Sequence, residues 1–317
     1  KEKWMPEAQF TKGLEDKGYQ IKTFKVSKGE CYEIYGFDKA GKKVEIYFDP
    51  ATGAELSRVP AGTAADVDRA VKTAQAAFEG PWSRMLPVQR QGLMLKLADL
   101  IEQNGEELAQ LETLNQGKSI MLSRLIEVQS SAEYFRYMAG WSTKIQGTTL
   151  DVSIPIPPGM SYQAFTRKEP VGVVAAITPF NSPLNTVTHK VAPALAAGNA
   201  LILKPSTHTP FTASLLVQVL LDAGVPAGFL TLLHGSGDVV RHLQADDRVR
   251  FFAFTGSTEV GRLIQQAAGL RRTQMELGSI ACTIVCEDAD LDMALPKIVN
   301  AGYRKAGQVC TSVQLLL

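Results

Sequence analysis

The feature that most constrains the fold of this chain is a run of short apolar segments that alternate with amphipathic ones from Val171 onward. Each apolar segment suits one buried strand, and the segments between them carry apolar residues at helical spacing. This alternation is typical of an α/β protein with a parallel, doubly wound sheet and helices on both faces. We expect strands at 171–178, 200–203, 229–233, 250–254 and 283–285, and helices at 189–197, 211–223, 238–243 and 259–268.

Helices are also expected in the region that precedes this sheet. Thr63 followed by Asp66 is a helix-capping pattern with an acidic group in the first turn. Around Pro157-Pro158-Gly159 the pattern changes to alternation, which predicts a hairpin over 150–169 that reaches outward to pair with another edge. The expected helices of this region cover 64–78, 87–104, 106–115 and 125–141.

The first fifty residues differ in composition from the rest of the chain, because Lys and Glu are frequent there. Gln9 to Glu15 predict one short helix. Three alternating runs follow, and turn residues at 38–42 separate the last two. We therefore expect a small α+β unit with a helix and a three-stranded meander. Its pattern resembles PepSY-type domains, which are often secreted or membrane-associated.

The composition excludes several classes of protein. A net charge of +1 gives no reason to expect nucleic acid or an anionic membrane as a partner. Four cysteines in 317 residues do not form a disulfide framework, and neither they nor the four histidines have the spacing of a metal site. No apolar run is long enough to span a membrane. The chain begins at Lys1 rather than Met, which is compatible with a removed leader, and we expect a cytoplasmic protein.

The residues after the predicted strands are candidates for ligand binding, since ligands of such sheets lie beyond the carboxyl ends of the strands. Gly256-Ser257 opens a predicted helix, where free N–H groups favour a phosphate. Lys204 suits either an ion pair or a ribose or phosphate contact. Gly235-Ser236-Gly237 begins a dinucleotide fingerprint but lacks its third glycine. Asn181 is either a turn former or a fixed amide donor.

Cys310 and Glu276 form a second candidate group. Cys310 lies among small and polar residues just after an apolar-periodic segment, which suits an exposed nucleophile. The neighbours of Glu276 are apolar, so we expect its carboxyl to be buried and its pKa raised. A thiol and a carboxylate are a minimal set for covalent catalysis with a general base. A single cysteine is more often a small buried hydrophobe, and spacing alone does not choose between the two interpretations.

Taken together, five motifs resemble the aldehyde dehydrogenase superfamily in order and spacing over about residues 50–317. They are Thr-Pro-Phe-Asn-Ser-Pro-Leu at 178–184, Leu-Lys-Pro-Ser at 203–206, Phe-Thr-Gly-Ser-Thr-Glu-Val-Gly at 254–261, Glu-Leu-Gly at 276–278 and Gly-Gln-Val-Cys at 307–310. The resemblance implies a Rossmann-like cofactor domain at 51–277, the start of a catalytic domain at 278–317, and a separate unit at 1–50. The hairpin matches the family's oligomerisation arm, which implies a homo-oligomer.

The resemblance also implies a mechanism. Cys310 would attack an aldehyde, and the Asn181 amide and the Cys310 N–H would hold the oxyanion. Hydride would pass to NAD or NADP, and Glu276 would activate water to release the acid. The cofactor would contact Thr178, Pro179, Phe180, Lys204, Ser206, Thr207, Gly237, Gly256, Ser257 and Leu277.

Two departures from the family pattern affect these expectations. Thr207 stands where the family often has a glutamate that binds the ribose hydroxyls, and the loss of that carboxylate favours NADP+. The chain also stops seven residues after Cys310, at Leu317, so the resemblance implies that this sequence lacks the rest of the family's catalytic domain. Two alternatives therefore stay open: a cofactor-binding or regulatory module without turnover, and a PepSY-like inhibitory protein carrying a passive domain.

Overall fold

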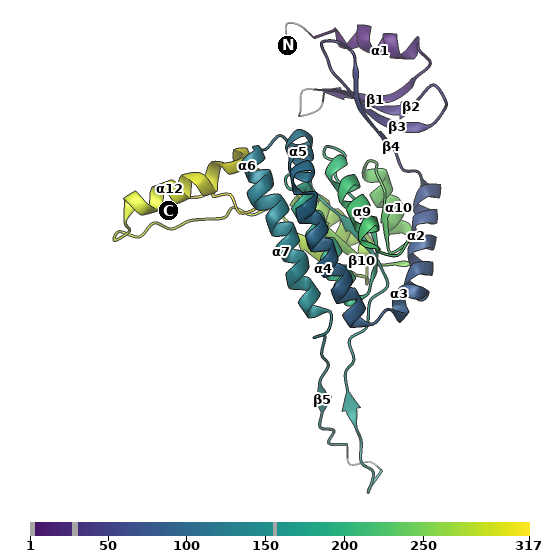
Figure 1. Cartoon of the computed structure of the whole chain (residues 1–317), viewed down its shortest axis with the longest axis vertical. Helices are drawn as coiled ribbons and strands as arrows, with labels where there is room; N and C mark the ends of the chain where they lie inside the picture. Colours follow the sequence, from purple (N-terminus) through teal and green to yellow (C-terminus); the bar gives the residue numbers. More distant parts are fainter. Residues whose placement is uncertain (1–3, 27–30, 155–156) are drawn as a thin grey trace.

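The computed structural model describes residues 4–26, 31–154 and 157–317, and its centre is a sheet of five parallel strands (Figure 1). The strand order β11-β10-β7-β8-β9 places the first strand in the middle, so the chain winds to one side and then to the other. The doubly wound α/β fold expected from the sequence is confirmed. The strands are β7 (Val173–Ile177), β8 (Ala200–Lys204), β9 (Leu230–Leu232), β10 (Val249–Thr255) and β11 (Arg272–Glu276).

Helices cover both faces of this sheet because its strands are apolar on both sides. In β7, Val174 and Ala176 face one helical layer, while Val173, Ala175 and Ile177 face the other. The first layer contains α4 (Pro87–Gln103), α5 (Gly105–Gln116), α7 (Gln129–Trp141), α8 (Pro183–Ala197) and α9 (Phe211–Ala223). The second contains α2 (Ala64–Glu79), α10 (Gly237–Ala245) and α11 (Thr258–Ala268).

The short connecting helices lie beside the first layer. They are α3 (Pro81–Arg84), α6 (Ile120–Leu122) and the π-helical turn η1 (Ser123–Val128), which leads directly into α7. The capping pattern predicted at Thr63 is present, because the Thr63 side chain accepts from the N–H of Asp66 and the Asp66 carboxylate accepts from the N–H of Thr63. Local sequence signals therefore place the start of α2 correctly.

The fifth strand differs from the sequence-based expectation. The sequence predicts a strand at 283–285, but this segment lies outside the central sheet, where Thr283 forms an isolated parallel bridge with Leu316. The fifth strand is instead β11, which pairs in parallel with β10. Its sequence, Arg-Thr-Gln-Met-Glu, is polar because an edge strand has one neighbour and is only partly covered. A search of the sequence for short runs of apolar residues therefore misses such a strand.

The N-terminal unit is a four-stranded antiparallel sheet with one helix, and it lies above the carboxyl edge of the central sheet (Figure 1). Its core contains Phe10, Leu14, Ile34, Ile46 and Phe48. The predicted meander has three strands, whereas the structure adds a fourth, so a division at residue 50 falls in the turn between the last two strands. The elements are α1 (Glu7–Glu15), β1 (Gln20–Val26), β2 (Tyr32–Phe37), β3 (Lys43–Phe48) and β4 (Glu55–Pro60).

Two segments project from this body (Figure 1). The predicted hairpin pairs β5 (Thr149–Leu150) with β6 (Ala164–Phe165), and its residues 155–156 lie outside the described part. The second is α12 (Leu291–Tyr303), which has no buried residue and is followed by the 3-10 turn η2 (Arg304–Gly307). The division of the chain into domains stays a prediction.

The core of the central sheet can be tested at Phe252, which is fully buried in β10 and belongs to the same core cluster as side chains of α2 and α11. We expect Phe252→Ala to lower the free energy of unfolding by roughly 3–5 kcal/mol, because it removes a large side chain and leaves a cavity. Urea unfolding measures the loss. The control is Leu270→Ala at a fully exposed position, with an expected change within about 0.5 kcal/mol. Equal effects of the two changes would contradict the assigned core.

Candidate active site

The register of the central sheet brings the predicted site residues to one edge. Ile177 at the end of β7 is level with Lys204 of β8 and with Phe254 of β10, and Thr255 is level with Glu276 of β11. The strand order reverses between β7 and β10, which is where ligands of such sheets bind. The segments that follow these strands therefore flank the expected ligand crevice.

A cavity of about 490 Å³ at this edge contains the three predicted catalytic residues, Asn181, Glu276 and Cys310. Cys310 follows the η2 turn and is exposed, as an accessible nucleophile requires. In that turn Lys305, Ala306 and Gly307 have φ values of 52°, 53° and 74°. Left-handed backbone is costly at the two non-glycine positions, so the surrounding contacts must hold the loop in place.

Asn181 is the link between the β7 loop and the Cys310 loop. Its Nδ2 donates to the Gln308 carbonyl at 2.9 Å, two residues before Cys310. An amide nitrogen carries two hydrogens, so one N–H can hold Gln308 while the other remains for a substrate oxygen. The Asn181 Oδ1 is buried without a hydrogen-bond partner among the described residues. The geometry fits a donor that is held beside the thiol.

Glu276 lies at the end of β11 and is exposed, so the burial expected from its apolar neighbours is wrong. The reason is that β11 is an edge strand, with no further strand to cover its last residue. Gln274 Nε2 donates to Glu276 Oε1 at 2.9 Å, and Lys190 Nζ donates to Gln274 Oε1 at 2.5 Å. Burial lowers the pKa of Lys190 to about 8, and attraction to Glu276 partly opposes that shift. Sequence reasoning missed Lys190, which sits on α8 with no motif of its own.

A buried charge cluster supports the same loops and was also missed from the sequence. Lys118 Nζ lies 2.5 Å from Glu112 and 2.6 Å from Glu127. Lys305 Nζ reaches Glu127 at 3.3 Å, the Asn181 carbonyl at 3.2 Å and Ser182 Oγ at 2.5 Å. The four charges balance, and Lys305 connects them to both sides of the cavity. Glu112, Lys118 and Lys305 lie on separate segments, and only their folded positions reveal the cluster.

The predicted cofactor residues occupy the other strand ends. The Ser257 side chain caps α11 by accepting from the N–H of Val260, and Gly256 N donates to the Glu276 carbonyl at 3.0 Å. A Cβ on Gly261 would come within 2.4 Å of Leu277 Cδ2, so the end of the Leu277 side chain packs closely against α11. Gly237 is the first residue of α10, and Thr178 Oγ1 is buried without a partner among the described residues.

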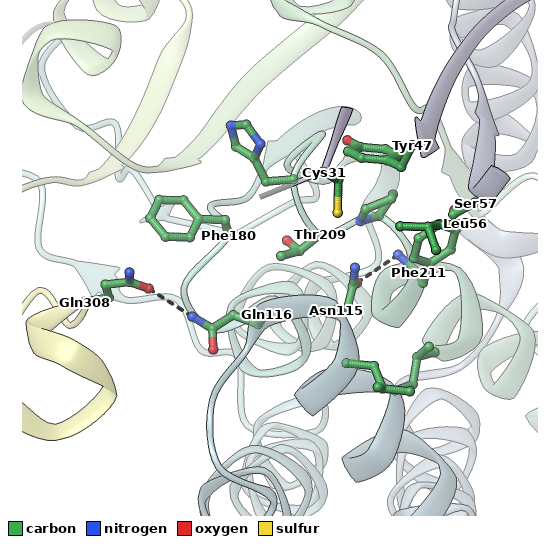
Figure 2. Close-up of a pocket in the computed structure, with 14 residues that line it drawn as sticks. Cys31, Tyr47, Leu56, Ser57, Asn115, Gln116, Phe180, Thr209, Phe211 and Gln308 are labelled. Carbon is green, nitrogen blue, oxygen red and sulfur yellow. Dashed lines mark hydrogen bonds between the residues drawn. The ribbon is translucent and has the colours of Figure 1, made fainter. Parts of the chain in front are cut away.

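Lys204 is the last residue of β8, and Ser206 and Thr207 follow it beside the N-terminal unit. The Lys204 side chain is buried, which lowers its pKa to about 8, while attraction to Glu45 opposes the shift. The Tyr47 hydroxyl donates to the Thr207 carbonyl. Figure 2 shows a second cavity, of about 570 Å³, with Tyr47 on one side and Phe180 on the other. The N-terminal unit thus forms part of the wall beside the predicted cofactor residues, whose roles stay predictions.

Within the described ranges, 4–26, 31–154 and 157–317, no group of three or more His, Cys, Asp or Glu side chains is placed to hold a metal ion. In those same ranges, no helix combines the length and apolar character that crossing a membrane requires.

The charge cluster predicts a stability effect. Lys305→Met leaves two buried carboxylates facing one cation, so we expect the free energy of unfolding to fall by about 3 kcal/mol. Adding Glu127→Gln should restore most of this loss because it balances the charges again. Urea unfolding of the wild type, the single variant and the double variant measures both steps. A double variant no more stable than Lys305→Met would contradict the assigned balance.

Two family models match this chain. The model of the aldehyde dehydrogenase family matches residues 37–317, and that of the peptidase propeptide and YPEB domain matches residues 1–58. The second match confirms the PepSY-like resemblance of the N-terminal segment.

Individual relatives and solved structures that resemble this chain are also aldehyde dehydrogenases. A phenylacetaldehyde dehydrogenase of Pseudomonas fluorescens is 46% identical over 86% of this chain and 55% of its own length. Retinaldehyde dehydrogenase 3 of Rattus norvegicus is 41% identical over 86% of this chain and 53% of its own. The NAD+ complex of an aldehyde dehydrogenase from Bacillus cereus has a TM-score of 0.80 at 34% identity, over 98% of this chain and 61% of that one. The chain thus spans about half the length of the curated relatives that it matches, and it belongs to the aldehyde dehydrogenase family.

Proposed function

We propose that this chain carries the nucleophile and cofactor-binding residues of an NAD(P)-dependent aldehyde dehydrogenase, which oxidises an aldehyde to a carboxylic acid. The observation that carries the proposal is the contact between Asn181 and the Gln308 carbonyl. It places an amide donor beside the exposed Cys310 thiol, in a cavity that Glu276 also lines.

In the proposed reaction the Cys310 thiolate adds to the aldehyde carbon. The free N–H of the Asn181 amide and the backbone N–H of Cys310 donate to the oxygen, and such a donor typically contributes ~3 kcal/mol to lowering the barrier. If NAD(P)+ is bound at the strand ends, it would supply the acceptor for the hydride that has to leave the Cys310 adduct before a thioester can form there. Glu276 then takes a proton from the water that attacks the thioester, and the carboxylic acid leaves with the thiol regenerated.

The residues at the strand ends fit a dinucleotide. Ser257 opens α11, where free N–H groups and the helix end favour a pyrophosphate. Thr178 Oγ1 is a buried hydroxyl with no partner among the described residues, so it can bond a bound group. Lys204 supplies an ammonium at the end of β8. The Bacillus cereus relative was solved with NAD+, which supports the same class of cofactor.

A cofactor-binding module without turnover is the second candidate. It is favoured by α12, the helix that leads to Cys310, because none of its residues is buried. Five of its apolar side chains are about half exposed or more: Leu291, Met293, Leu295, Val299 and Tyr303. A nucleophile on a poorly covered support is harder to hold in one geometry.

A single-turnover experiment separates these two candidates. The chain is mixed with phenylacetaldehyde and excess NAD+ or NADP+, and the reduced nicotinamide is followed by absorbance. We expect Cys310→Ala to slow its formation roughly thousandfold or more, since the covalent route is removed. Cys286→Ala, at another exposed cysteine, should leave the rate unchanged. Equal rates in wild type and Cys310→Ala would contradict the thiolate mechanism, and cofactor binding without reduction would favour the module.

The projecting hairpin supports the proposal of a homo-oligomer. Its strands have free edges and carry exposed apolar side chains, among them Leu150, Ile154, Met160 and Phe165. Phe165 is 73% exposed, so Phe165→Glu should not disturb the fold but should place a charge in any contact that covers it. We expect light scattering to show a smaller assembly for Phe165→Glu, with Leu270→Glu as the surface control. An unchanged assembly in both would count against the hairpin as an interface. The cytoplasmic location stays a prediction.

A further inference from the structure

One helix lends the cavity at Cys310 a row of uncharged polar side chains. On α8, Leu184, Val187 and Val191 belong to the buried core beside the central sheet. Residues about one turn apart lie on the same face of a helix, so the remaining face of α8 is continuous. That face is polar, and the side chains with which it lines the cavity are those of Ser182, Asn185, Thr186 and His189.

A second group of side chains in the same cavity is apolar or aromatic. Leu122, Ile126 and Tyr134 come from α6, η1 and α7, respectively. A ligand in this cavity therefore meets hydrogen-bonding groups from α8 and apolar groups from the segments that precede it. A short carbon chain with hydroxyl groups offers both kinds of surface, because its C–H groups suit the apolar side chains and its hydroxyls suit the polar ones.

Asn185 is the polar side chain of this row whose hydrogen-bonding capacity is unused. Its Oδ1 is buried without a hydrogen-bond partner, and its amide nitrogen bonds to no other side chain or backbone group in the described part of the chain. The Thr186 hydroxyl, in contrast, donates to the Ser182 carbonyl at 2.6 Å. A carboxamide is both donor and acceptor, and so is a hydroxyl group. The Asn185 amide is therefore suited to an alcohol.

We propose that the polar face of α8 selects aldehydes that carry hydroxyl groups close to the carbonyl, and that Asn185 is the residue that determines this specificity. The inference rests on the proposed function, which places the aldehyde carbon at Cys310 and its oxygen at Asn181. Asn185 follows Asn181 by four residues and lines the same cavity, so the hydroxyl that it bonds belongs to a carbon near the carbonyl. An aldehyde without hydroxyls can enter the cavity but leaves the Asn185 amide unpaired, which is unfavourable.

The experiment compares DL-glyceraldehyde with propanal, which has the same carbon chain without hydroxyl groups. The full chain is assayed with each aldehyde and excess NAD+, and kcat/KM is obtained from the formation of reduced cofactor. We expect the wild type to favour glyceraldehyde by roughly tenfold to a hundredfold, the range for pairing one buried polar group. Asn185→Leu keeps the size of the side chain but removes its hydrogen-bonding group, so the glyceraldehyde-to-propanal ratio should fall at least about tenfold. The hydration of each aldehyde in solution is the same for every variant and cancels in this change.

Thr186→Val is the matched control. Thr186 lines the same cavity from the same helix, but its hydroxyl is already bonded to the Ser182 carbonyl. Its removal should therefore leave the ratio of the two kcat/KM values unchanged.

A binding measurement makes the inference independent of turnover. Calorimetry on Cys310→Ala compares glycerate with propanoate, the acids that correspond to the two aldehydes and that share one carboxylate. Glycerate should bind more tightly than propanoate, and adding Asn185→Leu should remove the difference.

The outcomes separate this inference from the proposed function. An active chain whose glyceraldehyde-to-propanal ratio is unaffected by Asn185→Leu would overturn the inference and leave the proposed function intact. An equal fall of the ratio in Thr186→Val would also overturn it, because the α8 face would then only shape the cavity. If neither aldehyde is oxidised while the preference for glycerate still depends on Asn185, the oxidation is lost and the ligand class stands. A wild type with no preference for glyceraldehyde or glycerate would contradict the assigned specificity.

Discussion

The parallel pairing of β7 with β10 is the constraint on which the rest of the site depends. It fixes the point where the strand order reverses, and its register holds the segments after Ile177 and Thr255 side by side. Because β8 and β11 pair outward from these two strands, Lys204 and Glu276 reach the same edge from opposite sides. A one-residue slip would exchange the residues that face the two helical layers. The buried apolar side chains of β7 therefore hold both the fold and the site geometry.

The loop that carries Cys310 has a strained backbone and is held by a buried charged side chain. Lys305 and Ala306 adopt left-handed backbone, which L-residues reach at a cost of about 1–3 kcal/mol each. The Lys305 ammonium offsets this cost by bonding the Asn181 carbonyl, Ser182 and Glu127. The Asn181 amide returns a bond to the Gln308 carbonyl. Each loop thus holds the other, and the thiol is presented by a linked pair of loops rather than by a helix or strand.

Much of the fold and the order of the site residues could be predicted from the sequence, for identifiable reasons. The strands β7, β8 and β10 can be recognised in the sequence as apolar runs, because both of their faces are buried. The polar strand β11 cannot be recognised in this way. For the same reason Glu276, at its end, was wrongly expected to be buried. Motif order selected Asn181 and Cys310 as candidates because each lies in a short sequence motif, and the structure places both at one cavity. It did not find Lys305 or Lys190, because both reach the cavity through contacts with distant segments. Lys305 follows α12, whereas its partner Glu127 lies in η1, and only the fold brings them together.

The most direct test of this account is the mass of the covalent state on Cys310. The full chain is mixed with phenylacetaldehyde and NAD+, quenched in acid and digested, and the peptides are weighed by mass spectrometry. The account predicts an added acyl group on the peptide that contains Cys310, and none on those that contain Cys282 or Cys286. Reduced cofactor accumulating without that adduct, or an adduct confined to another cysteine, would contradict it.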